Sequence, residues 1–238
     1  MTILLGAGAT AILLRAARAA PPGQASTGQI NGKIYLKGAK PKLARIMMDQ
    51  DPVCASVHPQ PVYAEDGEVN SDGAVPNAFL YIKSGLQQSN FPTPSQPVIL
   101  DQRGCVYVPH VLGAMVGQVL KVVSSDPTTH NVHFMPKENR EYNASQIPGA
   151  APLVMRFTRP EIMIPVKCNQ HPWMKAYIGV VSNPFYAVTG DDGAFTIKGL
   201  PPGDYTVAAW TATFGTQEQK VTVRAGQPAT ADFTFSTQ

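Results

Sequence analysis

The sequence predicts an all-β protein, large enough for one large or two small β domains. The 238 residues include 20 glycines and 22 prolines, and only 15% of them are charged, which suits short strands joined by many turns. Apolar and polar residues alternate along several short runs, as in half-buried strands. After the first 20 residues no helix is evident in the sequence pattern. A chain of this length can bury a substantial core.

The strands expected in the first half are short and are separated by turn residues. Residues 28–38 alternate apolar and polar side chains, whereas residues 40–64 contain four prolines and are expected to be irregular. Residues 77–83 form an apolar strand, and a loop rich in polar residues follows at 87–96. Gly104, Pro109 and Gly117 then separate four further expected strands, at 98–100, 105–108, 111–115 and 119–123.

The strands expected in the centre of the chain surround two turns. Asp126-Pro127 makes a turn that delivers His130 to the start of a strand. Residues 137–152 are polar and are expected to form a loop. Three further strands are expected at 153–157, 162–166 and 177–181.

Two segments carry residue types that bind copper. Residues 129–134 read THNVHF, and residues 167–174 read KCNQHPWM. Together they supply a thiolate, two imidazoles and a thioether, from Cys168, His130, His171 and Met174. Soft sulfur ligands favour Cu(I), and imidazole suits both copper oxidation states. A strand ending at Cys168, a tight loop and a departing strand bring three of these ligands together, and His130 reaches them from a neighbouring strand.

These two segments resemble those of the cupredoxins, the type 1 blue-copper proteins, and most closely the amicyanin and plastocyanin kind. The resemblance covers about 80 residues and implies a Greek-key β-sandwich with copper held by His130, Cys168, His171 and Met174. It also implies that Asn131 ties the two ligand-bearing loops together by hydrogen bonds near the sulfur. Four protein ligands leave no open coordination position, so an electron carrier is expected rather than an enzyme.

Two residues near the expected ligands have competing interpretations. His133 is the other candidate for the histidine ligand on this strand. Strand alternation places His130 and His133 on opposite faces, so His133 is expected to be structural or at the surface. His171 is expected to bring copper closest to solvent. Trp173 beside it either packs over the site or belongs to an apolar docking patch for a redox partner.

The C-terminal segment has a different pattern. An Asp-Gly turn at 192–193 and a Pro-Gly turn at 202–203 border alternating strands, which predicts a hairpin. The stretch resembles the carboxypeptidase regulatory-like, transthyretin/Ig-like β-sandwich. About 50 residues are few for such a sandwich, so the strand at 28–36 is expected to pair with it. The expected division is a signal peptide or anchor at 1–23, an N-terminal β segment at 24–95, the copper domain at 96–185 and this small module at 186–238.

The three cysteines fit an oxidising compartment. With Cys168 assigned to copper, Cys54 and Cys105 form an even pair that is expected to be a disulfide. A second metal site, using His58 and His110 with these cysteines, is the alternative, together with free buried thiols.

The N-terminal residues predict export. An apolar run is followed by Arg15, Arg18 and small residues, which resembles a signal peptide, although no basic residue precedes the run. The run is too short to span a bilayer, which takes about 20 residues. A periplasmic or other extracytoplasmic location is expected, with membrane association through the N-terminus as an option. The net charge of +3, to which these two arginines contribute, indicates no nucleic-acid partner.

The function expected from these observations is one-electron transfer through a type 1 copper site. The redox partner is expected to be a cytochrome or a membrane oxidoreductase complex. Two alternatives remain open: a structural or assembly subunit in which copper is stabilising or vestigial, and a protein for copper storage or delivery.

Overall fold

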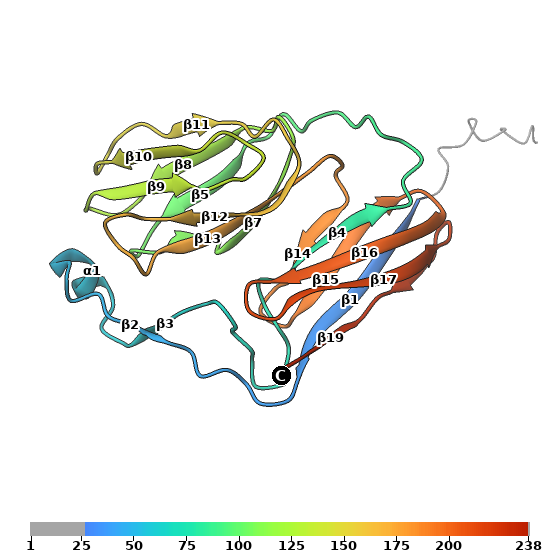
Figure 1. Ribbon diagram of the computed structural model, residues 1–238, viewed down its shortest axis with the longest axis horizontal. Helices are drawn as coiled ribbons and strands as arrows, with labels where there is room; N and C mark the ends of the chain where they lie inside the picture. Colours follow the sequence, from blue (N-terminus) through green and yellow to red (C-terminus); the bar gives the residue numbers. More distant parts are fainter. Residues whose placement is uncertain (1–26, 238) are drawn as a thin grey trace, which may run out of the picture.

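The computed structural model describes residues 27–237, and this part of the chain is almost entirely β-sheet (Figure 1). The described residues contain a single α-helix, of six residues. Four larger sheets form two sandwiches that lie side by side, which confirms the predicted all-β fold class with two sandwiches. The expected signal peptide or anchor at 1–23 lies outside the described residues.

The first sandwich contains the segments with the copper-binding residue types. One sheet has the order β10 (Tyr142–Gln146), β9 (His130–Phe134), β12 (Glu161–Lys167), β13 (Lys175–Val181), β7 (Val111–Met115). The other has the order β11 (Leu153–Met155), β8 (Leu120–Ser124), β5 (Val98–Gln102), β6 (Tyr107–Val108). The pairs β13–β7 and β5–β8 are parallel, so each sheet is mixed. Apolar side chains of both sheets, Leu100, Val122, Phe134 and Ile178 among them, are fully buried between them.

The second sandwich joins the two ends of the described chain. In one sheet β1 (Gly28–Lys37) lies between β15 (Ala194–Leu200) and β18 (Pro228–Thr230), and β19 (Phe233–Ser236) also pairs with β1. The facing sheet has the order β14 (Tyr186–Val188), β4 (Phe79–Ser84), β16 (Gly203–Thr211), β17 (Gly215–Val223). All strands of the first sandwich therefore lie in the chain between β4 and β14. The domain boundaries expected from the sequence stay a prediction.

Two glycines allow the sandwiches to approach closely. A Cβ atom on Gly113 in β7 would lie 2.2 Å from the Tyr186 ring, and one on Gly179 in β13 would lie 2.4 Å from the Phe79 ring. Both distances are too short for real contacts, so a side chain at either position would push the sheets apart. The aromatic rings of β4 and β14 thus pack directly on the backbone of the first sandwich.

Two segments differ from the sequence-based expectation. The expected loop at 137–152 contains strand β10, which pairs with β9 at the sheet edge, so that prediction is wrong there. The irregular segment at 40–64 contains β2 (Arg45–Ile46), α1 (Pro52–Val57) and β3 (Val62–Tyr63). The signal for α1 was Asp51-Pro52, since aspartate caps a helix N-terminus and proline suits its first turn. The Asp51 carboxylate accepts hydrogen bonds from the N–H groups of Val53 and Cys54.

We call residues 45–63, from β2 through α1 to β3, the strap. The strap runs beside the first sandwich (Figure 1). Its buried side chains Met48 and Cys54 form a small core with Cys105, and Trp173 packs against that core.

The buried His110 contacts Asp66, which lies just after the strap. His110 Nδ1 contacts the Lys175 carbonyl oxygen at 3.0 Å, and its Nε2 lies 3.0 Å from Asp66 Oδ1. Burial opposes protonation of this ring, but the hydrogen bond and charge of Asp66 and the charge of Glu65 outweigh it. The pKa of His110 is therefore raised above its ordinary value of 6.5.

We expect the His110→Gln variant to lose the stability that comes from this raised pKa. Such stability is fully present below the unfolded-state pKa, near 6.5, and disappears as the pH rises through the higher folded-state pKa. Urea unfolding of parent and variant should therefore show the largest stability difference at pH values below 6.5. A difference that grows toward alkaline pH would contradict the assignment.

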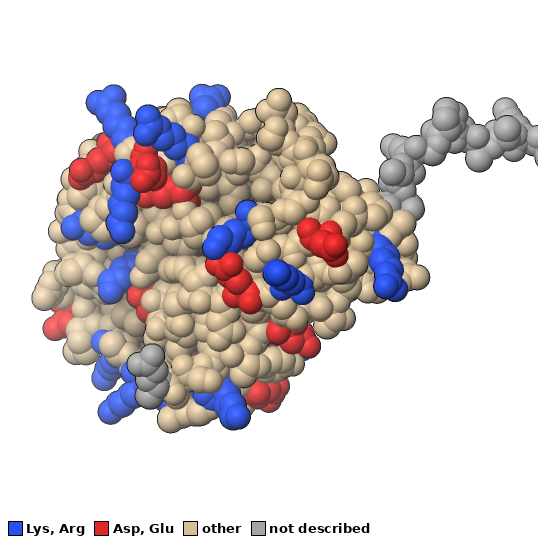
Figure 2. All heavy atoms as spheres, turned by 45° about the vertical axis from the view of Figure 1, so that its right-hand side comes forward, with Lys and Arg blue, Asp and Glu red and all other residues tan. Residues whose placement is uncertain are grey.

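On the face shown in Figure 2, positive and negative side chains are interspersed among wide uncharged areas. The single helix within residues 27–237 is not long and apolar enough to cross a lipid bilayer.

Candidate metal centre

Three of the expected ligands meet at one end of the first sandwich. His130 is the first residue of β9, Cys168 follows the last residue of β12, and His171 lies in the loop before β13. One ligand atom from each lies within 4.8 Å of the other two. The two Nδ1 atoms are 3.0 Å apart, and Cys168 Sγ lies 3.7 Å from His171 Nδ1. All three side chains are buried.

The loop that carries Cys168 and His171 is tied by its own backbone. The β12–β13 hairpin pairs Lys167 with Lys175, so the seven residues between them form the loop. The Cys168 N–H contacts the Met174 carbonyl at 3.3 Å, and the Met174 N–H donates to the His171 carbonyl at 2.9 Å. The His171 N–H points to Cys168 Sγ at 3.4 Å. This closure fixes the sulfur and the imidazole relative to each other.

Asn131 links the two ligand-bearing segments. Its backbone N–H points to Cys168 Sγ at 3.3 Å, and its side-chain oxygen accepts a hydrogen bond of 3.1 Å from the Asn169 N–H. Its amide nitrogen donates to Asn143 Oδ1 at 2.8 Å. The sulfur thus faces two backbone donors, from Asn131 and His171.

Met174 lies in the same buried cluster as Cys168. Its side chain has no solvent exposure and packs in the core between the two sheets. Its position at the end of the ligand loop brings its backbone to Cys168.

His133 lies away from the three grouped residues. Its Nε2 contacts Glu141, and its Nδ1 is 3.3 Å from Asn169 Oδ1. Among the described residues, the groups able to hold a metal include His130 and not His133.

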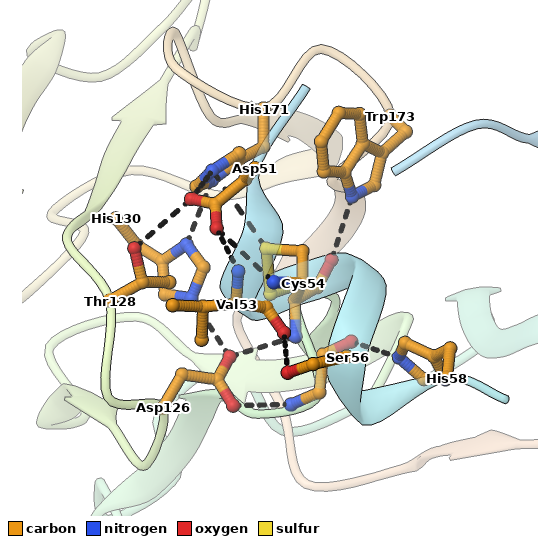
Figure 3. Close-up of a disulfide and its surroundings, with 12 residues drawn as sticks. Asp51, Val53, Cys54, Ser56, His58, Asp126, Thr128, His130, His171 and Trp173 are labelled. Atoms are coloured by element: carbon orange, nitrogen blue, oxygen red, sulfur yellow. Dashed lines mark hydrogen bonds and ion pairs between the residues drawn. A yellow bond between two sulfur atoms is a disulfide. The ribbon is translucent and has the colours of Figure 1, made fainter. Parts of the chain in front are cut away.

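The expectation that His171 approaches solvent is wrong. His171 is only 5% exposed, because the strap covers it (Figure 3). His171 Nε2 lies 3.0 Å from Asp51 Oδ2 and 3.9 Å from Cys54 Sγ. The half-buried Trp173 packs on the same ring, with centroids 5.0 Å apart, and donates from Nε1 to the Cys105 carbonyl at 2.9 Å. A docking role for Trp173 stays a prediction.

Two carboxylates complete the surroundings of the histidines, and sequence reasoning missed both. His130 Nε2 lies 2.8 Å from Asp126 Oδ2, as His171 Nε2 lies near Asp51 (Figure 3). Asp126 is itself held by the N–H groups of Gly104, at 2.6 Å, and Cys105, at 2.8 Å. Each aspartate precedes a proline in the sequence, which signalled a turn or a helix start but not a partner for histidine.

The carboxylates determine where the histidine protons lie. A carboxylate only accepts hydrogen bonds, so each Nε2 carries the hydrogen and each Nδ1 is left with a lone pair. The two Nδ1 atoms then face each other at 3.0 Å, next to a thiol sulfur. Two lone pairs at this distance repel unless a cation or a shared proton lies between them. A copper ion bound by both imidazoles and the thiolate fits this donor set.

Burial affects the ionisable groups around the centre. Burial lowers the pKa of His130, although Asp126 opposes the shift. Burial, and then the nearby Cys168, raise the pKa of Tyr107 far above its ordinary value. The Tyr107 hydroxyl therefore stays protonated and donates to the Asn131 carbonyl at 2.5 Å.

The expected disulfide is confirmed. Cys54 in the strap and Cys105 in the sandwich are bonded, and both are fully buried. The alternatives of a second metal site and of free buried thiols are wrong, since the bond uses both sulfurs. His58 instead contacts the Gly104 carbonyl, and His110 contacts Asp66. The bond holds the strap against the candidate metal centre.

Comparisons with known proteins gave one family-model match and several similar solved structures. The family model of the carboxypeptidase regulatory-like domain matches residues 171–236. Curated proteins give no match.

Similar solved structures include a copper-containing nitrite reductase from Thermus scotoductus, with a TM-score of 0.34, 20% identity, and 41% of this chain and 25% of that chain covered. A purple cupredoxin from Nitrosopumilus maritimus has a TM-score of 0.30 and 16% identity, and the match covers 34% of this chain and 97% of that chain. An oxidised amicyanin variant has a TM-score of 0.33 and 17% identity, and the match covers 42% of this chain and 97% of that chain. This chain thus spans a quarter of the reductase.

Proposed function

We propose that the protein is a one-electron carrier, in which a type 1 copper would be held by His130, Cys168, His171 and Met174. The observation that carries the proposal is the buried group of one cysteine sulfur and two inward-facing Nδ1 atoms. When bound, copper would supply a reversible Cu(I)/Cu(II) couple in a geometry that changes little between the two states.

The protein residues around the centre suit this role. Asp126 and Asp51 orient the two imidazoles from outside, so that neither ring must turn when the charge of the centre changes. The Asn131 and His171 N–H groups withdraw charge from the sulfur. The covering strap excludes water from the His171 side. Four protein ligands would leave no position for a substrate, which favours an electron carrier over an enzyme.

The proposal includes an extracytoplasmic location and a redox protein as partner. The location is supported by the Cys54–Cys105 disulfide, because structural disulfides persist in oxidising compartments and are rare in the cytosol.

Repeated redox cycling tests the proposed function. The copper-loaded protein should take up one electron per chain, lose its colour, and regain it on oxidation over many cycles. A chelator that competes for Cu(I) should leave the metal in place throughout. Ready loss of copper to the chelator would support storage or delivery instead, and a protein that binds copper but cannot be cycled would contradict electron transfer.

We expect Met174→Gln to retain copper and to lower the reduction potential. An amide oxygen is a harder ligand than a thioether, so it favours Cu(II) over Cu(I). Voltammetry of parent and variant gives the two potentials, and Met163→Leu, a buried methionine outside the ligand loop, is the matched control. Equal potentials in the parent and Met174→Gln would show that Met174 is not a copper ligand.

A further inference from the structure

The proposed copper centre is closed on its His171 side. Asp51, the Cys54–Cys105 disulfide and Trp173 all pack against this imidazole, which is 5% exposed. A redox partner therefore cannot touch the His171 ring while the strap is in place. A side on which a partner can approach another ligand closely would allow faster transfer, because the rate of transfer falls steeply with distance.

A cavity of about 420 Å³ lies beside the ligand loop, and Cys168 forms part of its lining. This volume is in the range of ordinary binding sites. Its lining consists mainly of apolar side chains, with Asn169 and two lysines; it includes Met135, Pro165, Lys167, Lys175 and Tyr177. The cysteine of the proposed centre is itself only 2% exposed, so the cavity reaches the residue that holds the sulfur without opening the centre to water.

The two lysines bracket the ligand loop. Lys167 precedes Cys168 and Lys175 follows Met174, and the two lysines are directly opposite each other in the β12–β13 pair. Like charges in this position destabilise a sheet. Lys175 has only a distant ion pair, at 4.0 Å from Asp66, and Lys167 has none among residues 27–237. None of the residues lining the cavity carries a carboxylate.

We propose that this cavity is the docking site for an acidic one-electron redox protein, whose carboxylates bind Lys167 and Lys175 and place its redox group over Cys168. This inference rests on the proposed electron-transfer function and names the partner's chemistry. One electron passes between the bound metal and the partner's redox group, so that one is oxidised as the other is reduced, and no bond or proton moves. The lysine pair steers the encounter, and the apolar lining supplies the small contact of a transient redox complex.

The docking site can be tested on the copper-free full chain with a redox-inert anion. Hexacyanochromate(III), a paramagnetic trianion, should broaden the backbone NMR signals of Lys167, Cys168 and Lys175 before others. The broadening should disappear in Lys167→Gln/Lys175→Gln and persist in Lys198→Gln, which removes an exposed lysine of the second sandwich. Because neutralisation removes a like-charge pair, the double variant should melt at or above the parent's temperature. Lys167→Gln alone should weaken the broadening, which keeps the test available should the double variant fold poorly.

Stopped-flow rates then test the partner's charge. The reduced, copper-loaded protein is mixed with succinylated cytochrome c, which is acidic, or with unmodified cytochrome c, which is basic. The rate with the acidic form should fall with rising ionic strength, and by about tenfold or more in the double variant at low salt. The rate with the basic form should not fall in that variant, and Lys198→Gln should match the parent with both.

The two experiments separate the docking site from the proposed function. Broadening centred elsewhere, or unchanged in the double variant, would overturn the docking site even if the protein carries electrons. Equal rates of parent and double variant with the acidic form would overturn it as well. Failure to load copper would contradict the proposed function, while the anion experiment on the copper-free protein would still decide whether this face binds acidic groups.

Discussion

Replacing Cys168 with serine should abolish the intense visible absorption expected of the copper-loaded protein. The band of a type 1 centre arises from charge transfer between thiolate and Cu(II), and a hydroxyl cannot supply it. Cys168 is buried, and two backbone N–H groups point to its sulfur, so the substitution removes the sulfur from an otherwise unchanged position. Absorption spectra of parent and variant with one equivalent of Cu(II) give the result.

His133→Ala is the matched control for this experiment. His133 belongs to the same strand as His130, but it contacts Glu141 and Asn169 outside the centre. The control variant should keep the band. A coloured Cys168→Ser protein would refute the ligand assignment, and a colourless His133→Ala protein would show that the wrong histidine of the strand was assigned.

Removing the disulfide should cause a large loss of stability. The bond joins residues 51 positions apart and so restricts the unfolded chain strongly. We expect the double variant Cys54→Ala/Cys105→Ala to lose about 2–4 kcal/mol in the free energy of unfolding. Urea unfolding of the copper-free proteins measures this difference without contributions from the metal.

The same variant should loosen the strap over His171. Cys54 anchors α1, whose N-cap is Asp51, so the contact between Asp51 and His171 depends on the bond. Amide hydrogen exchange should become faster across the strap. Val57→Ala, an exposed position of the same helix, should change neither quantity appreciably. Unchanged stability and exchange in the double cysteine variant would mean that packing alone holds the strap.

Local patterns were sufficient to predict most strands of the first sandwich and the loop that carries Cys168 and His171. Alternation along β9 distinguishes His130, which is buried, from His133, which faces partly outward. The spacing of Cys168 and His171 places both in one hairpin loop. These predictions succeed because the relevant interactions join residues close in the sequence or within one strand.

The strap over the centre could not be predicted from such patterns. Asp51 and His171 are 120 positions apart, and Cys54 and His171 are 117 apart. Asp51-Pro52 indicates a helix start, but nothing local shows which imidazole its carboxylate will meet. Strand β10 was missed because it lies at a sheet edge and pairs only with β9, so it needs little apolar alternation. Long-range packing therefore decides how exposed the centre is.

The most direct test of the account is a titration of the metal-free full chain with Cu(II), followed by visible absorption. If His130, Cys168 and His171 form a type 1 centre, an intense thiolate-to-copper band should grow linearly and stop at one equivalent of Cu(II) per chain. A protein that stays colourless, or that shows only the weak absorption of copper bound by nitrogen and oxygen, would contradict it.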